Sequence, residues 1–451
     1  MDRKEYIDRL FACAGERCPG VESEVCFETG SSFEVSMKNG EIHQYNVADS
    51  QGLGFRVLKD GRTGAASTQI LDDEAVSMLV DGAIENAGLV ESKDRQFMFP
   101  GSESYPELNL RNPAVDALTA AEKIDMAMRL ERLTLDQDPR IAQVEDCAVF
   151  SSSDLRLMRN TLGLDVSMEA SLLGGYVVAV ARDGDRVNTG VKAFFTLDPA
   201  AVDLEAVAAA AAKEALDGLD GAPVPSGRYR VLLRRNVAAT LLATFSGIFS
   251  ADNAQRGLSR LKGREGETVA AGCVTLMDDP HRPDSASSTP FDGEGVATAA
   301  KAVIEAGRLN TLLHNLKTAH KQGVSTTANA ARSSYASGVG VAPTNFFFAP
   351  SDADFEAMLA KTGDGLLITE IQGMHAGANP ITGDFSLAAK GFRVEHGKIG
   401  AAVNQITVAG SFYELMKDIE AVGADLEFRT PGVSCFGSPS VLVRELSVAG
   451  T

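Results

Sequence analysis

The residues best suited to hold a metal ion are the histidines, because a neutral imidazole is a common zinc ligand. The chain has six of them: His43, His281, His314, His320, His375 and His396. His314 and His320 lie six residues apart, which puts them on different faces of a helix or about 20 Å apart along a strand. Neither geometry forms a chelating pair, and no H-E-x-x-H motif occurs in the chain. The histidine spacing therefore predicts no metal site.

Motifs for nucleophilic catalysis and for nucleotide binding are also missing. The sequence contains no G-x-S-x-G, no G-x-x-x-x-G-K-[ST] and no strand-linked G-x-G-x-x-G. Cys435 is flanked by glycines in the run G-V-S-C-F-G, which would suit an accessible thiol, but a structural role is the simpler expectation. We therefore predict no catalytic residue, no bound cofactor and no metal ligand from these motifs.

A glycine-rich stretch, residues 373–386, gives one histidine a setting that would suit substrate binding. The stretch follows a predicted strand and precedes another, and its Asn-Pro and Thr-Gly-Asp runs favour tight turns. His375 would be able to hydrogen-bond a substrate there, alone or together with Asp384. A rigid crossover whose polar groups satisfy its own backbone explains the same residues, and we favour that interpretation.

The composition excludes several classes of partner. The 451 residues include 42 Lys and Arg against 61 Asp and Glu, a net charge of −19, and no Lys/Arg block is longer than two residues. Such a charge repels phosphate backbones and anionic membranes, so we predict no direct binding of nucleic acid and no membrane association. No run of 18 apolar residues occurs, and the six cysteines form no C-x-x-C pair. We expect a cytoplasmic protein with reduced thiols.

Hydrophobic periodicity predicts helices and an antiparallel sheet in the first half of the chain. Two alternating runs end at Asn39-Gly40 and at Asp60-Gly61, whose residues suit hairpin turns. This order of elements favours an antiparallel meander over βαβ units. The predicted helices are 3–14, 73–84, 115–136 and 201–217, and the predicted strands are 33–37, 53–58, 141–150, 164–182 and 187–196.

The segment D-G-A-P-V-P-S-G, residues 220–227, interrupts this periodicity with two prolines and two glycines. We place a domain boundary here, between an N-terminal α+β domain, residues 1–221, and a C-terminal β-rich domain, residues 222–451. The second domain is predicted to hold a mixed, barrel-like sheet with helices at 352–361 and 411–421. Segment 295–315 fits either a helix or a hairpin. The predicted fold class is α+β with two domains.

Short motifs along the whole chain resemble the TldD/PmbA family, whose members were once called modulators of DNA gyrase. Each motif alone is weak, but their order and spacing together make a strong match, and the chain looks most like the PmbA (TldE) branch. The matching residues are 52–62, Gly64, Ser67 and Thr68 in the N-terminal part, and 291–296, 379–386 and 438–450 in the C-terminal part.

The resemblance implies a two-domain α+β protein that forms a dimer in the cytoplasm. TldD-type members of the family are zinc metallopeptidases with an H-E-x-x-x-H helix and a distant cysteine ligand. PmbA-type chains pair with them, lack the zinc motif and are needed to process peptides. The partners implied for this chain are a TldD-like zinc subunit or a second copy, together with peptide substrates.

The uncharged run 236–251 predicts a buried helix, and the TldD pattern aligns with it. The two His slots of that pattern fall on Leu242 and Gly247, and the Glu slot falls on Ala243. In a zinc peptidase the imidazoles hold the metal and the carboxylate takes a proton from the attacking water, which these residues cannot do. No His or Glu occurs from 231 to 262, so no shift of the alignment restores the motif.

Three hypotheses remain open at this stage. The leading one is a metal-free subunit that helps a zinc-bearing partner to process peptides, because the chain resembles the family throughout while its ligand slots are empty. Cys435 lies near the expected thiol position, but its surroundings depart from the zinc-type pattern. The second is a stand-alone enzyme that uses His375 with Asp384, or Cys435. The third is a regulatory protein that binds gyrase without catalysis.

Overall fold

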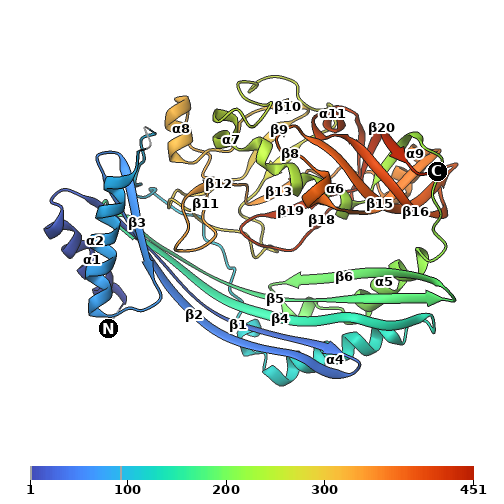
Figure 1. The fold of residues 1–451 in the computed structure, drawn as a ribbon, viewed down its shortest axis with the longest axis horizontal. Helices are drawn as coiled ribbons and strands as arrows, with labels where there is room; N and C mark the ends of the chain where they lie inside the picture. The colour runs from blue at the N-terminus through green and yellow to red at the C-terminus, as the bar shows by residue number, and fades with distance from the viewer. Residues whose placement is uncertain (1–2, 92–93) are drawn as a thin grey trace.

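The structure is a computed structural model that describes residues 3–91 and 94–451. Two lobes lie one above the other in Figure 1: a long, curved antiparallel sheet with helices, and a C-terminal region built on two mixed sheets. This arrangement confirms the predicted α+β class and the barrel-like sheet of the C-terminal region. Among the described helices, none has the length and apolar character needed to cross a bilayer.

The N-terminal sheet is antiparallel throughout, with the strand order β3-β2-β1-β4-β5-β6. Its first two hairpins turn where the sequence predicts, at Asn39-Gly40 and Asp60-Gly61, and all four residues have positive φ. The strands are longer than predicted. The prediction relied on the alternation of polar and apolar residues, which covers only part of each strand. The strands are β1 Glu22–Lys38, β2 Glu41–Lys59, β3 Arg62–Thr68, β4 Ile141–Asn160, β5 Asp165–Asp183 and β6 Arg186–Thr196.

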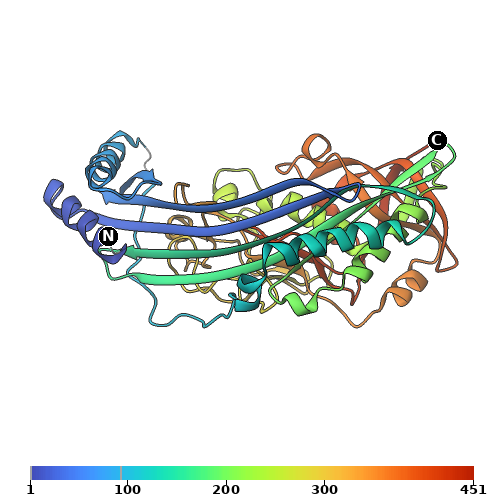
Figure 2. The ribbon, with the colours of Figure 1, turned by 90° about the horizontal axis from the view of Figure 1, so that it is seen from below.

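The two faces of this sheet have different neighbours. On β1 the odd-numbered Val25, Phe27, Val35 and Met37 pack against helices, with α1 and α2 at one end of the sheet and α4 and α5 at the other. Figure 2 shows α4 lying along the strands. On the opposite face of β1, Glu24, Cys26 and Glu28 contact the C-terminal region. The helices are α1 Arg3–Arg17, α2 Asp73–Leu89, α3 Pro113–Ala117, α4 Ala120–Leu135 and α5 Leu204–Asp217.

The C-terminal region contains a closed barrel, because β16 pairs with β20 as well as with β15. The barrel order is β16-β15-β14-β7-β20, and β17 extends the sheet beyond β20. The predicted domain boundary falls between α5 and β7, and it stays a prediction. The strands are β7 Gly227–Leu233, β14 Gly365–Gln372, β15 Asp384–Glu395, β16 Lys398–Ser411, β17 Ile419–Val422 and β20 Val441–Ala449.

A second sheet, in the order β10-β9-β8-β13-β19-β18, shares one hydrophobic core with the barrel. Segment 295–315 forms a hairpin, not a helix, because Ala306 and Gly307 adopt the positive φ of a tight turn. These strands are β8 Leu276–Asp278, β9 Lys301–Glu305, β10 Arg308–Leu309, β13 Asn345–Phe348, β18 Glu427–Phe428 and β19 Cys435–Ser438; β11 Ala330–Ala331 and β12 Gly340–Val341 form a separate pair.

Short helices fill the space around these sheets. The helix predicted at 411–421 ends early, because the chain enters β17 and pairs with β20. The predicted buried helix at 236–251 is also interrupted: α6 is followed by a 3-10 turn, Ser246–Phe249, before α7 begins. The helices are α6 Arg235–Phe245, α7 Ala251–Gln255, α8 Leu316–Gln322, α9 Phe355–Thr362, α10 Met374–Gly377 and α11 Phe412–Lys417.

The contact between α2 and β3 gives a test of the N-terminal packing. A Cβ atom on Gly64 would lie 2.1 Å from the carbonyl oxygen of Ala83 and 2.2 Å from the nitrogen of Ala87, so α2 would have to move. We expect Gly64→Ala to lower the free energy of unfolding by about 1–3 kcal/mol, measured by chemical denaturation. Gly88→Ala, in α2 where a Cβ meets open space, is the control and should not destabilise. Equal effects of the two changes would contradict this packing.

Candidate functional site

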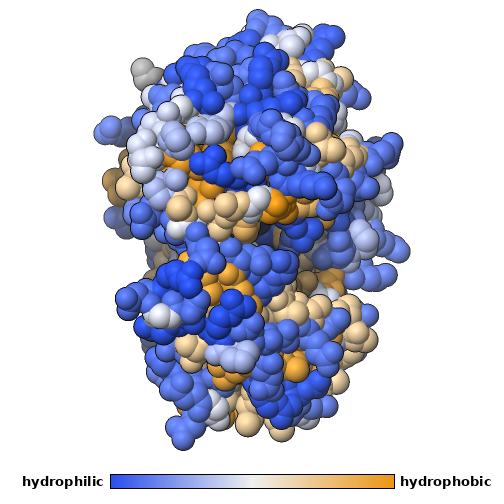
Figure 3. All heavy atoms as spheres, turned by 90° about the vertical axis from the view of Figure 1, so that its right-hand side faces the viewer, coloured by the Kyte–Doolittle hydropathy of each residue, from blue (hydrophilic) through white to orange (hydrophobic). Residues whose placement is uncertain are grey.

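A cavity of about 380 Å³ lies between the N-terminal sheet and loops of the C-terminal region. The two lobes meet along a furrow, which Figure 3 shows from one end of the molecule. The floor of the cavity is formed by two cross-strand pairs of β1 and β4, Glu28 with Arg156 and Gly30 with Asp154. The roof is formed by residues 286–289, 291–293, 328–332, 342–344 and 432–433.

The floor carries two carboxylates and one guanidinium. Arg156 donates its Nε to Glu28 Oε1 at 2.8 Å, and Glu28 Oε2 accepts the backbone N–H of Tyr335 at 3.0 Å. The Asp154 carboxylate lies across Gly30, where a Cβ would approach Asp154 Oδ1 to 2.2 Å. Desolvation, together with nearby Glu28, raises the pKa of Asp154. The floor is therefore polar and acidic, with Arg156 already engaged.

A buried ion cluster joins the two lobes beside this cavity. Arg56 Nη2 lies 3.0 Å from Glu24 Oε1, and Arg332 Nη2 donates to the same oxygen at 2.5 Å. Glu24 is fully buried, which disfavours its charge, but the attraction of the two guanidiniums outweighs this and lowers its pKa. Glu24 is therefore a charged bridge between β1, β2 and the loop that follows β11.

The motif Gly52-Leu-Gly-Phe-Arg explains how that loop reaches β2. A Cβ on Gly54 would lie 1.9 Å from the carbonyl oxygen of Tyr335, and one on Gly52 would lie 2.0 Å from the Tyr335 ring. The two glycines therefore admit the loop against the strand. Phe55 points to the opposite face, into the core under α1 and α2, and Arg56 returns to the ion cluster.

The motif Phe-Asp-Gly-Glu-Gly-Val, residues 291–296, supports the roof. The Asp292 carboxylate accepts the backbone N–H groups of Glu294, Val296 and Ala330 at 2.9, 3.1 and 3.0 Å, and burial raises its pKa to about 6. Glu294 Oε2 accepts the N–H of Leu316 at 2.8 Å. Burial and the adjacent Asp292 raise the pKa of Glu294 to about 7. Both carboxyl groups therefore hold loops together. Their ionisation costs free energy, because the charged form is buried away from water.

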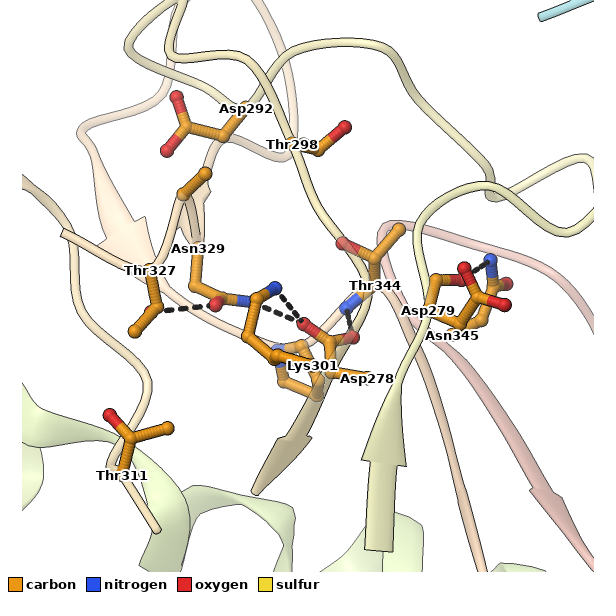
Figure 4. Close-up of polar contacts among 12 residues, drawn as sticks. Asp278, Asp279, Asp292, Thr298, Lys301, Thr311, Thr327, Asn329, Thr344 and Asn345 are labelled. Carbon is orange, nitrogen blue, oxygen red and sulfur yellow. Dashed lines mark hydrogen bonds and ion pairs between the residues drawn. The ribbon is translucent and has the colours of Figure 1, made fainter. Parts of the chain in front are cut away.

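Another buried carboxylate, that of Asp278, ties two of the roof loops together (Figure 4). Asp278 Oδ2 accepts Lys301 Nζ at 3.0 Å and Asn329 Nδ2 at 2.7 Å, while Oδ1 accepts the N–H of Thr344 at 2.7 Å. Asn329 also accepts the hydroxyl of Thr327 at 2.8 Å. Asn329 and Thr344 both line the cavity, so Asp278 positions part of its wall without reaching it.

The positions that the TldD pattern would use for zinc lie on α6 and just beyond it, and none of them lines the cavity. Leu242 is fully buried in the core, while Ala243 and Gly247 are half-buried. None of the three side chains offers a donor atom, and no group of three His, Cys, Asp or Glu that would hold a metal ion occurs within residues 3–91 and 94–451. The residues present do not fit a zinc ion.

Cys435 is not an accessible thiol. It is buried at the start of β19, its Sγ donates to the carbonyl oxygen of Arg429 at 3.2 Å, and burial raises its pKa to about 11. The Arg429 guanidinium donates to the hydroxyl of Thr240 on α6 at 2.5 Å. The Arg429 guanidinium thus lies between α6 and β19, the strand that carries the thiol.

The other sequence candidates lie apart from the cavity. His375 and Asp384 are both exposed, and the turn between them satisfies itself: Asn379 Oδ1 accepts the N–H groups of Ile381 and Thr382. His314 is buried, and burial lowers its pKa.

Sequence reasoning missed the ion cluster. Glu24 lies in an alternating strand, where a carboxylate normally faces solvent, and Arg332 lies outside every recognised motif. Arg56, at the end of the glycine motif, was the only residue of the ion cluster that lay in a recognised motif.

Profiles for three PmbA/TldA metallopeptidase domains match the chain: domain 1 over residues 23–87, the central domain over 113–219 and the C-terminal domain over 226–450. The metalloprotease PmbA of Escherichia coli O157:H7 is 28% identical, with 99% of this chain and 96% of that protein covered. A solved structure from Thermotoga maritima, described as a modulator of DNA gyrase, is 36% identical with a TM-score of 0.91, covering 99% of this chain and 100% of that one. TldE from Thermococcus kodakarensis has the same fold, with a TM-score of 0.89 at 22% identity and coverage of 99% and 100%.

The raised pKa of Glu294 predicts a pH dependence of stability. Its pKa rises from an ordinary 4.5 to about 7, so the folded chain holds this proton more tightly than the unfolded chain does. Stability from this group is therefore present at low pH and is lost as the pH rises from about 4.5 to about 7. Glu294→Gln removes the loss and keeps an oxygen to accept the N–H of Leu316.

We expect the Gln variant to gain up to about 3 kcal/mol relative to the unmodified chain between about pH 5 and about pH 8, followed as the difference in thermal midpoint. Glu85→Gln, at an exposed position of α2, is the control and should show no such trend. A pH-independent difference for Glu294→Gln would contradict the assignment.

Proposed function

Because the chain belongs to the PmbA/TldD metallopeptidase family, we propose that it is the metal-free subunit of a two-chain peptidase. A TldD-type partner would carry the zinc ion and perform the hydrolysis, and this chain would hold and present the peptide. One observation carries the proposal. The chain resembles the family along its whole length, yet Leu242, Ala243 and Gly247 stand where a zinc peptidase needs its metal ligands and its base.

The surroundings of α6 support this division of labour. A zinc site needs a water-accessible position with three protein ligands, whereas Leu242 is packed in the core and the Cys435 thiol is engaged by a carbonyl oxygen. The Arg429 guanidinium beside α6 would also repel a dication. We therefore assign no step of the hydrolysis to these residues.

The cavity between the lobes supports a peptide as the bound molecule. Its floor is a β-sheet face and its roof is a set of hydroxyl- and amide-bearing loops, which suit an extended chain with many donors and acceptors. Glu28 and Asp154 make the floor acidic, and only Glu28 is neutralised by Arg156. Basic or neutral peptides are therefore the favoured substrates.

One edge of the N-terminal sheet has the features of a surface that binds a partner chain. β3 pairs with β2 only from Leu53 to Lys59, so residues 41–51 have no neighbour on that side among the described strands. All of these residues are exposed, including Ile42, Tyr45 and Val47 at 49, 50 and 62%. An unpaired strand with apolar side chains is a template for pairing with another chain. We assign this edge to the partner subunit.

The first test is metal content and activity. The purified chain should contain no stoichiometric zinc, measured by inductively coupled plasma mass spectrometry, and should cleave no peptide alone. Addition of a TldD-type partner should give peptidase activity that a chelator removes. One equivalent of zinc in the isolated chain, together with chelator-sensitive cleavage, would refute the proposal.

The second test concerns the sheet edge. Lysines at Tyr45 and Val47 would put charge on the unpaired strand, so Y45K/V47K should weaken association with the partner about tenfold or more, measured by analytical ultracentrifugation. Ile399→Lys, at a comparably exposed apolar residue of β16, is the control. If both variants associate as the unmodified chain does, the partner binds elsewhere.

A further inference from the structure

A second cavity, of about 360 Å³, lies on the other side of the loop that carries Arg332 and Tyr335, and these two residues line both cavities. Its charged lining residues are Arg56, Lys317 and Arg332, and no Asp or Glu belongs to the lining within the described part of the chain. A purely cationic cavity stands out in a chain whose net charge is −19. The cavity is therefore suited to an anionic group.

Two of the three cations that line this cavity form ion pairs with the same carboxylate. Arg56 and Arg332 share the carboxylate of Glu24, whereas Lys317 Nζ pairs with Asp252 at 2.9 Å. The Nε atoms of both arginines are buried without a hydrogen-bond partner among the residues that the structure describes. These Nε atoms are closed off from the open cavity, but the net positive charge of its lining is costly unless a counter-charge lies near it.

Two further buried carboxyl groups interact with these arginines: burial raises the pKa of Asp292 and the attraction of Arg332 opposes this rise, and Arg56 acts in the same way on Glu294. Glu294 Oε2 is engaged by the N–H of Leu316, and burial next to Asp292 raises the pKa of Glu294 to about 7. A large fraction of Glu294 is thus protonated at neutral pH. Asp292 and Glu294 therefore offset part of the charge of the arginines, which leaves the cavity better suited to a monoanion than to a phosphate with nearly two charges.

We propose that this second cavity binds the C-terminal carboxylate of the peptide whose body lies in the first cavity. The inference rests on the proposed peptide-holding function and names the end of the substrate that is recognised. A carboxylate matches the planar donors of a guanidinium, and Ser67 and Gln96 supply neutral donors in the same cavity. Arg332 and Tyr335, at the wall between the cavities, would fix the last residue of the peptide.

The test compares two peptides that differ only at the C-terminus. The probes are fluorescein-labelled Ala-Ala-Lys-Ala-Ala-Ala as the free acid and as the amide, titrated by fluorescence anisotropy into the full chain and into its complex with the partner. The free acid should bind about tenfold more tightly or better, because only it carries the charge that the arginines need. Equal affinities of the two peptides would overturn the proposal. It would also be overturned if neither peptide bound to the full chain or to the complex.

Matched variants on α8 localise the effect. Lys317→Gln removes a cavity cation, and Asp252 keeps Arg256 as a neighbour, so the fold should survive. This variant should weaken binding of the free acid severalfold and leave the amide unchanged. Lys321→Gln, which breaks the outlying pair with Asp94, is the control and should change neither. Identical effects of the two variants would contradict a site at this cavity.

Competition with inorganic phosphate tells whether the cavity binds a peptide carboxylate or a phosphate group. At millimolar concentration phosphate should compete only weakly with the free-acid peptide. Displacement of that peptide by micromolar phosphate would show that the cavity serves phosphate, and would overturn the carboxylate assignment. The proposed function is judged separately by the peptidase activity of the complex, so either can fail without the other.

Discussion

The buried pairing of Glu24 with Arg56 and Arg332 is the interaction on which the relation between the two lobes depends. It joins β1, β2 and the loop after β11, and that loop separates the two interlobe cavities. Removal of one partner from such a cluster costs about 3–5 kcal/mol, because a buried charge is left uncompensated. The cavities therefore have defined walls only while all three charges are present.

The rest of the interlobe site is built around that cluster by groups that position loops: Asp292 in the wall of the first cavity, and Asp278 behind that wall. Asp278 and Asp292 each accept several hydrogen bonds from loops of the roof, and both are buried. The cavity floor, in contrast, belongs to long strands held by two separate helix pairs. A rigid floor and a tied roof suit the holding of an extended molecule, while α6 offers packing where a peptidase would offer ligands.

Much of the fold could be predicted because its signals are local. The turns at Asn39-Gly40 and Asp60-Gly61 and most helices of the N-terminal part follow from residue type and spacing alone. Segment 295–315 remained ambiguous because alanine favours a helix, and only the pairing of β9 with β10 decides it. The site was hardest to predict: Arg332 meets Glu24 across 308 residues, and no local pattern marks either. The motif around Gly54 was visible, but its reason, the close approach of Tyr335, is tertiary.

The most direct test of the central claim is a titration of peptidase rate against the mole ratio of this chain to a TldD-type partner at fixed partner concentration. If this chain holds the peptide and the partner supplies the metal, the rate rises to a plateau at one chain per partner while the zinc content of the mixture stays that of the partner alone. A rate that is independent of this chain, or zinc that increases with each addition of it, would contradict the account.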